Sequence, residues 1–176
     1  MKKIFVIILA LASISLSAAV VHAATDDARL KSITQGCAEL LTSLEQLQRR
    51  DLVARTNRGR AYEAQITQMN AFAQRLRNNN ISSQPLDGPT NDFKNAVDTF
   101  RTAYVQYDDR MTTLLQIDCR AKPDEFATAL DQVRNLRDNV GAQVSRGETS
   151  LTTYRQAIVD LQTTLPQPLN EGSVQQ

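Results

Sequence analysis

Five arginines lie within twelve residues of this chain: Arg49, Arg50, Arg55, Arg58 and Arg60. Asp51 is the only acidic residue among them. A guanidinium group can form two parallel hydrogen bonds with a carboxylate or a phosphate. One interpretation is therefore a binding site for an anionic polymer, a lipid headgroup or an acidic partner. The other, which we favour from sequence, is a solvated helix face whose charges pair with acidic residues on neighbouring helices.

The only histidine, His22, lies at the end of a segment with the pattern of an export signal. Residues 1–23 combine two lysines, an apolar stretch at 4–16 and a small-x-small cleavage site at 21–23. We therefore expect the mature chain to be secreted, periplasmic or otherwise outside the cytoplasm. Cleavage after Ala23 would leave that chain without histidine.

An uncleaved N-terminal anchor is the alternative, because residues 4–21 form a largely apolar stretch close to the length that crosses a bilayer. Lysines held on the inner side would place the rest of the chain outside in either case. Cleavage would change the formal net charge from +1 to −1, since Lys2 and Lys3 would leave with the signal. A nearly neutral exported domain is not expected to bind nucleic acid.

The residue types that remain exclude most catalytic sites. Without histidine the mature chain has no Ser-His or Cys-His nucleophile and no histidine metal site, and it has no glycine-rich phosphate loop. The adjacent acids Asp26-Asp27 and Asp108-Asp109 would point in different directions on a helix, which is typical of surface charge. We expect no enzyme activity, no cofactor and no metal site.

Two cysteines, Cys37 and Cys119, are predicted to form one intramolecular disulfide, as is typical of an exported chain with an even cysteine count. Redox-active pairs usually occur as Cys-x-x-Cys, so this wide spacing favours a structural crosslink. The bond requires Cα atoms within about 7 Å of each other. It therefore constrains the alignment of the helices that carry the two cysteines.

Those helices are predicted from apolar residues that recur at steps of three and four. The pattern indicates helices at about 26–78, 91–118 and 123–165. A proline- and glycine-containing break at 78–89 and a shorter one at 119–123 separate them. No segment shows the alternation that is typical of a strand.

The predicted fold is all-α: an elongated, antiparallel, up-down-up three-helix bundle, similar to a coiled coil, with one interhelical disulfide. It spans residues 24–165, and residues 166–176 are predicted to be a disordered tail. The second helix should be the central one, because its apolar stripe carries four of the eight aromatic residues expected in the mature chain. The stripe comprises Phe93, Val97, Phe100, Tyr104, Tyr107, Met111 and Leu114.

The disulfide also sets a register for the first two helices. Residues opposed across them should have numbers that sum to about 156, the sum of the two cysteine positions. Asp98, Asp108 and Asp109 then lie opposite the arginine cluster, which favours internal charge pairing. Three glycines inside predicted helices are expected to mark close approach of a neighbouring helix, since glycine otherwise costs about 1 kcal/mol relative to alanine. They are Gly59, Gly141 and Gly147.

Two functions remain open from the sequence. The first is an exported, non-enzymatic structural or interaction protein of the cell envelope or extracellular space, with another envelope or surface protein, or a second copy, as partner. The second is an envelope binding module or chaperone, which would hold an anionic ligand or client at the arginine cluster or on a face of the bundle. Peripheral contact with a membrane has no support in the sequence.

Overall fold

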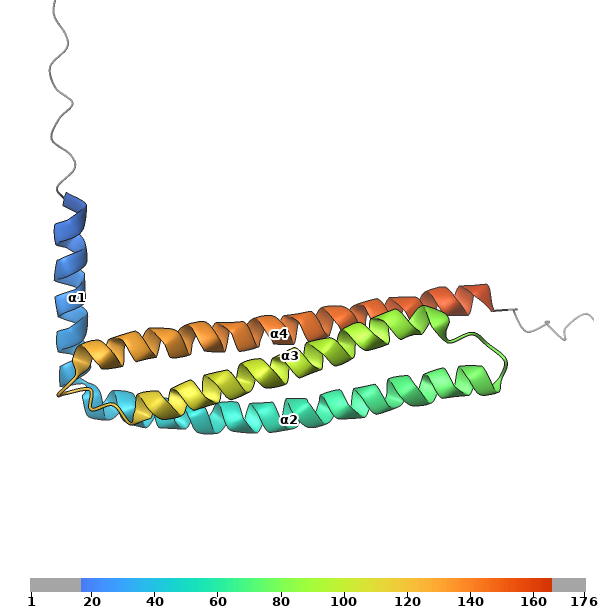
Figure 1. The fold of residues 1–176 in the computed structure, drawn as a ribbon, viewed down its shortest axis with the longest axis horizontal. Helices are drawn as coiled ribbons and strands as arrows, with labels where there is room; N and C mark the ends of the chain where they lie inside the picture. Colours follow the sequence, from blue (N-terminus) through green and yellow to red (C-terminus); the bar gives the residue numbers. More distant parts are fainter. Residues whose placement is uncertain (1–16, 166–176) are drawn as a thin grey trace, which may run out of the picture.

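The structure is a computed structural model that describes residues 17–165, with side chains described from residue 26 onward. This part of the chain contains four α-helices and no strand. The helices are α1 (Ser17–Gln35), α2 (Cys37–Asn78), α3 (Gln84–Leu115) and α4 (Pro123–Thr164). Helices α2, α3 and α4 run alongside one another, each antiparallel to the next, whereas α1 turns away from them (Figure 1).

The expectation of an all-helical chain is confirmed, but the prediction of three helices is wrong. Gly36 divides the first predicted helix, and a Cβ atom there would lie 3.3 Å from the Ser32 carbonyl oxygen. The last turns of α1 then pack against the start of α4. Ile33 is buried in that contact, and Arg29 donates a 2.6 Å hydrogen bond to Asp131. The predicted apolar stretch of the export signal and the predicted C-terminal tail lie outside the described residues.

Helix α2 ends in a Schellman motif. Asn80 adopts a positive φ of 59°, a conformation that asparagine tolerates better than most residues. The N–H of Asn80 donates a hydrogen bond to the Arg77 carbonyl, and the N–H of Ile81 donates one to the Leu76 carbonyl. Ile81 and Leu76 also pack in the same apolar cluster, so the turn is fixed by both hydrogen bonds and burial.

Helix α3 begins at Gln84, earlier than the predicted start at residue 91. Pro85 is accommodated because the first turn of a helix needs no N–H donor, and Pro89 lies inside the helix. Leu86 is fully buried at this end of the bundle. Burial of Leu86 stabilises a helix in this segment, although the two prolines by themselves predicted a loop.

The turn between α3 and α4 is organised by Asp118. Its Oδ1 atom accepts the backbone N–H groups of Arg120 at 2.9 Å and Ala121 at 3.1 Å. These hydrogen bonds lower the pKa of the Asp118 carboxyl. Helix α3 ends at Leu115, three residues before the predicted end, and α4 starts at the predicted Pro123.

The apolar core of the bundle consists of two clusters, which we call the disulfide-end core and the far-end core. The disulfide-end core includes Cys37, Leu44, Met111, Leu114, Cys119, Phe126 and Val133. The far-end core includes Tyr62, Met69, Leu76, Leu86, Phe93, Val97, Tyr154 and Leu161. The two clusters separate along α2, which lacks buried residues between Leu44 and Tyr62.

The three long helices are packed unequally. Helices α3 and α4 are in contact along most of their length, and α2 makes fewer contacts with α3. Between α2 and α4, no two Cα atoms of the described residues come within 8 Å of each other. Side chains rather than closely spaced backbones therefore fill the space between α2 and α4.

Candidate functional site

The midsection of α2 carries polar side chains where its ends carry apolar ones. The apolar stripe stops after Leu47 and resumes at Tyr62. Steps of three and four from Leu44 to Tyr62 select four polar or charged positions. They are Gln48, Asp51, Arg55 and Arg58, each half-buried rather than exposed. These side chains face the other helices, so the α2 midsection replaces an apolar core with a polar one.

Opposite this midsection, α3 keeps a continuous aromatic surface. Phe100, Tyr104 and Tyr107 are all buried. The rings of Tyr104 and Tyr107 meet edge to face with centroids 5.7 Å apart, and Phe100 lies 6.4 Å from Tyr104. Tyr62 of α2 completes the row with an edge-to-face contact to Phe100 at 5.6 Å. Such pairs are favourable beyond simple burial, so these rings form a rigid floor.

A three-helix polar network closes one end of this region. Arg137 of α4 donates two hydrogen bonds to the Asp51 carboxylate, at 2.8 and 3.2 Å, and the Tyr107 hydroxyl donates a third at 2.7 Å. Burial alone would raise the pKa of Asp51, but these hydrogen bonds outweigh it, and the pKa lies below the ordinary value of 3.8. The Asp51 side chain is only 18% exposed. Side chains of α2, α3 and α4 are thus joined at a single carboxylate.

Arg55 and Tyr104 form the next layer along the midsection. The Arg55 guanidinium lies 4.7 Å from the centroid of the Tyr104 ring, a cation–π contact. The Tyr104 hydroxyl is buried and has no hydrogen-bond partner within the described residues. Burial, followed by the nearby carboxylates, raises the pKa of Tyr104 to about 12. A neutral hydroxyl with an unused donor therefore lies in this region at ordinary pH.

These groups line a cleft of about 360 Å³ between α2 and α4. Arg55 and Arg58 border it from α2, and Arg137 and Val144 border it from α4. Aromatic residues of α3 form its floor. A Cβ atom at Gly141, which also lines the cleft, would meet nothing within 4 Å.

The structure separates the five arginines of the predicted cluster. Arg55 and Arg58 line the cleft, and Arg58 lies 3.9 Å from Glu148 of α4. Arg49 is exposed and lies 3.7 Å from Glu45 of its own helix. The remaining two, Arg50 and Arg60, are exposed. The cluster therefore contains two core-facing arginines and three surface ones.

Only Arg58 of the predicted cluster forms an ion pair across the bundle among the described residues, and its partner is none of the predicted aspartates. Asp98 pairs with Arg101 of its own helix at 3.0 Å, and Asp108 accepts a hydrogen bond from Gln48. The partner of Arg58 is instead Glu148, on α4. Sequence reasoning placed α3 alone opposite the arginines and so missed the contribution of α4.

Sequence reasoning gave neither Arg137 nor Tyr104 a role in a site. Arg137 occupies the apolar stripe of its helix, where a charged residue is unusual. That position, read together with Asp51 on the stripe of α2, was the available signal for an ion pair between the two helices. Nothing in the sequence distinguishes Tyr104 from the other aromatic residues of α3.

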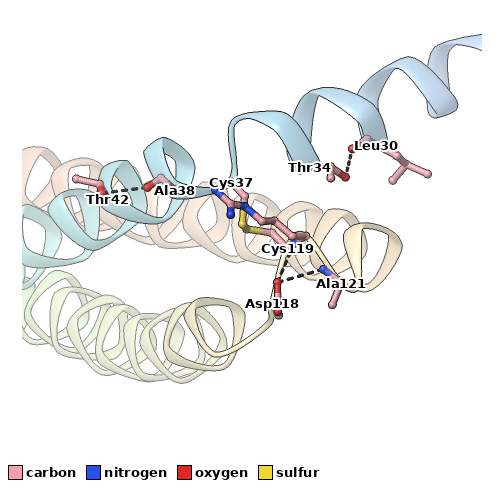
Figure 2. The surroundings of a disulfide bond; sticks show 9 residues. Leu30, Thr34, Cys37, Ala38, Thr42, Asp118, Cys119 and Ala121 are labelled. Atoms are coloured by element: carbon pink, nitrogen blue, oxygen red, sulfur yellow. Dashed lines mark hydrogen bonds between the residues drawn. A yellow bond between two sulfur atoms is a disulfide. The ribbon is translucent and has the colours of Figure 1, made fainter.

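The two cysteines lie where the predicted register requires them. Figure 2 shows Cys37 at the start of α2 beside Cys119 in the turn between α3 and α4, with their sulfur atoms at bonding distance. The Cα atoms are 5.7 Å apart and both residues are buried. Gln48 bonds Asp108, and Tyr62 packs on a residue of α3 within one position of the predicted one.

The predicted glycine contacts hold at only one of three positions. A Cβ atom at Gly147 would lie 3.4 Å from the Tyr62 hydroxyl and 3.9 Å from Phe93, so the helices are close there. Gly59 and Gly141 have nothing within 4 Å, and close approach was the wrong expectation for them. Both line hollows beside the polar midsection of α2, where the helices are held apart by longer side chains.

The described residues offer few alternatives to this site. Within 17–165, no group of three or more histidine, cysteine, aspartate or glutamate residues is arranged to hold a metal ion. None of the described helices combines the length and apolar character needed to cross a bilayer. Comparison with known proteins finds no match: no family model, curated protein or solved structure is detectably similar to this chain.

Proposed function

We propose that this chain is an exported, non-enzymatic interaction protein of the cell envelope or extracellular space, which presents a long helical surface to a partner. The observation that carries the proposal is the shape of the molecule, a narrow bundle of long helices crosslinked at one end (Figure 1). A buried cysteine pair separated by 82 residues fits an oxidising compartment, where such bonds persist. The N-terminal pattern of lysines, apolar residues and a small-x-small site supports the same compartment.

The proposal predicts which part of α1 remains after cleavage of the export signal. Cleavage after Ala23 would remove the first residues of α1 and leave Ala24–Gln35. The contacts that hold α1 to α4, through Arg29 and Ile33, lie in the part that remains. Processing therefore leaves the docked turns of α1 intact.

Photo-crosslinking in intact cells tests the interaction role. A photoreactive amino acid would replace Val53 on α2 or Val159 on α4, which are 60% and 50% exposed. We expect a discrete crosslinked species from the processed, exported chain at one of these positions or more. Retention of the unprocessed chain in the cytoplasm would contradict export, and a series of exposed positions that yields only free protein would contradict the interaction role.

A binding module or chaperone is the second candidate function, and the cleft between α2 and α4 favours it. A chaperone should suppress aggregation of a reduced client protein at stoichiometric amounts. A binding module that uses the exposed arginines should instead bind dextran sulfate and lose that binding when Arg49, Arg50 and Arg60 are replaced by glutamine. If the chain neither suppresses aggregation of the client nor binds dextran sulfate, both the chaperone and the binding-module candidates are contradicted.

A further inference from the structure

We propose that the cleft between α2 and α4 is a binding site for a small organic anion, in which Arg55 and Arg58 hold the anionic group and the aromatic floor of α3 holds an apolar or aromatic body. The inference deepens the binding-module candidate and rests on it. It is independent of whether the surface of the bundle also recruits a protein partner.

The dimensions of the cleft suit such a ligand. Its volume of about 360 Å³ falls within the range of roughly 300–1,000 Å³ that is usual for small-molecule sites. Phe100, Tyr104 and Tyr107 lie at the base of the cleft with 1–3% of their surface exposed, and the half-buried Val140 and Val144 supply accessible apolar surface from α4. A site of this kind, apolar with a few convergent polar groups, is typical of ligand pockets rather than of surface irregularities.

Two of the three arginines at the cleft keep hydrogen-bonding capacity for a ligand. Arg137 is committed to Asp51 through two hydrogen bonds. Arg58 is 3.9 Å from Glu148, too long for a hydrogen bond, and Arg55 forms no ion pair within the described residues. A guanidinium with free N–H groups beside an apolar surface is well suited to a carboxylate, sulfonate or phosphate.

The Tyr104 hydroxyl, at the cleft, is one of three buried tyrosine hydroxyls without a hydrogen-bond partner among the described residues, together with those of Tyr62 and Tyr154. Tyr104 is 3% exposed and lines the cleft, yet its hydroxyl has no partner within the described residues. A buried donor without a partner is unfavourable, but the hydroxyl oxygen is inaccessible in this structure, so an anion would reach it only by displacing a covering side chain such as Arg55, which lies over the Tyr104 ring. Tyr107, the next residue along the floor, already donates to Asp51 and so cannot take this role.

The charges at the cleft are arranged so that an anion fits at one end. Three arginines and two aspartates line it, which gives a net charge of +1. Both aspartates, Asp51 and Asp138, lie at the end closed by Arg137, and the Asp51 charge is neutralised there. Helices α2 and α4 run parallel, so Arg58 lies near Val144 at the other end, away from Asp51 and Asp138. The Glu148 carboxylate lies 3.9 Å from Arg58 there, and a bound anion would compete with it.

The test uses two probes that differ only in charge. Anilinonaphthalene sulfonate carries an anionic group on an aromatic body, and phenyl naphthylamine is the same body without it. Both would be titrated by calorimetry and fluorescence into the full processed chain with its disulfide intact. We expect one sulfonate probe per chain, and binding of the neutral probe weaker by about tenfold or more, since one charge-assisted contact is lost. Equal affinity for the two probes would overturn the proposal.

Two variants with matched controls locate the site. Gly141→Leu would fill the cleft and should reduce sulfonate affinity by about tenfold or more, whereas Gly88→Leu, also at an exposed helical glycine with open space, should leave it unchanged. Arg58→Gln should weaken binding by about tenfold, and Arg49→Gln, with the same loss of charge, should have no effect. Thermal unfolding by circular dichroism verifies that each variant is folded. If Gly141→Leu does not fold, the arginine pair decides the question.

Other outcomes separate this proposal from the function on which it rests. Sulfonate binding that survives both Gly141→Leu and Arg58→Gln would place the probe elsewhere and overturn the assignment. Binding of dextran sulfate without binding of the aromatic sulfonate would contradict the cleft ligand but preserve a binding role for the exposed arginines. Binding of neither would contradict both.

Discussion

The ends of α2 and its middle pack against the rest of the bundle by different chemistry. At each end, apolar residues such as Leu44 and Met69 enter a core that excludes water. In the middle, Asp51, Arg55 and Arg58 take the equivalent positions. Long charged side chains need hydrogen-bond partners or water, so they cannot be buried as closely as leucine. The same helix is thus a core element at its ends and the wall of a cleft in between.

This difference explains why α2 and α4 stay apart in the midsection. Helices α3 and α4 meet through apolar residues along most of their length, whereas in the midsection α2 and α4 meet through the Asp51–Arg137 and Arg58–Glu148 pairs. Side chains can span such a gap, but the backbones stay apart. Polar residues at core positions often specify one alignment at some cost in stability. In this bundle the polar residues of the α2 midsection also leave the cleft between α2 and α4.

The largest effect is expected in the far-end core. Phe93→Ala should lower the free energy of unfolding by about 3–5 kcal/mol, because Phe93 is fully buried and packs edge to face on Tyr62. Urea denaturation followed by circular dichroism measures this. Val53→Ala on the exposed face of α2 is the control and should change stability by less than about 0.5 kcal/mol. Similar losses for both would contradict the division into core and surface.

The disulfide-end core should depend on the cysteine pair. Replacement of Cys37 and Cys119 by serine should lower stability by about 2–4 kcal/mol, since the crosslink restricts an unfolded loop of more than 80 residues. Mass spectrometry of the unreduced chain should show a monomer two hydrogens lighter than the reduced chain. Two free thiols in freshly exported protein would contradict the bond. The far-end core is expected to keep its hydrogen-exchange protection better than the disulfide-end core in the double variant.

The midsection should be sensitive to its central carboxylate. Asp51→Asn should cost about 1–3 kcal/mol, because it leaves the Arg137 charge without its partner while it preserves the shape of the side chain. Asp109→Asn, at an exposed residue of α3, is the matched control and should be nearly neutral. An equally small effect at Asp51 would show that the three-helix network does not stabilise the bundle.

The Asp51 contribution should also depend on pH in a defined direction. The pKa of Asp51 in the folded chain lies below 3.8, so its ion pair stabilises the fold fully above that pH. As the pH falls further, through the lowered pKa, the carboxylate is protonated and the contribution is lost. The stability difference between the native chain and Asp51→Asn should therefore narrow below about pH 4. A difference that stays constant down to pH 2 would exclude this origin.

The smallest effects compare two glycines of α4. Gly141→Ala should raise stability by about 0.5–1 kcal/mol, because alanine favours a helix and its methyl group enters open space. Gly147→Ala should gain somewhat more, because its buried methyl group would make ordinary van der Waals contacts with Tyr62 and Phe93. Thermal unfolding of the two variants measures the difference. Equal gains would indicate that α2 and α4 are equally far apart at both positions.

Several features were predictable because they depend on local chemistry. Pro123, followed by two acidic residues, predicted the first residue of α4 correctly. The two cysteines predicted which ends of α2 and α3 meet. The gap in the apolar stripe between Leu47 and Tyr62 was visible too. The sequence did not show what this gap does in the fold, because a polar residue at a core position can either face water or bind a partner on another helix.

Other features failed for an identifiable physical reason. Pro89 argued for a loop, but burial of Leu86 in the far-end core stabilises the helix around it. Gly36 gave no stronger signal than the other glycines, yet it divides the first helix because α1 gains contacts with α4 by turning away. Long-range packing outweighed local propensity in both cases.

The sequence by itself determined that this chain is helical, where α4 begins and ends, where α2 ends, and which two cysteines meet. These properties follow from residue periodicity, caps and turn residues, which act over a few positions. Only the tertiary structure decided that α2 and α4 stay apart, that Arg137 reaches Asp51, and that a cleft lies above Tyr104. Such distances depend on the combined size and charge of side chains from three helices, which no single segment of sequence contains.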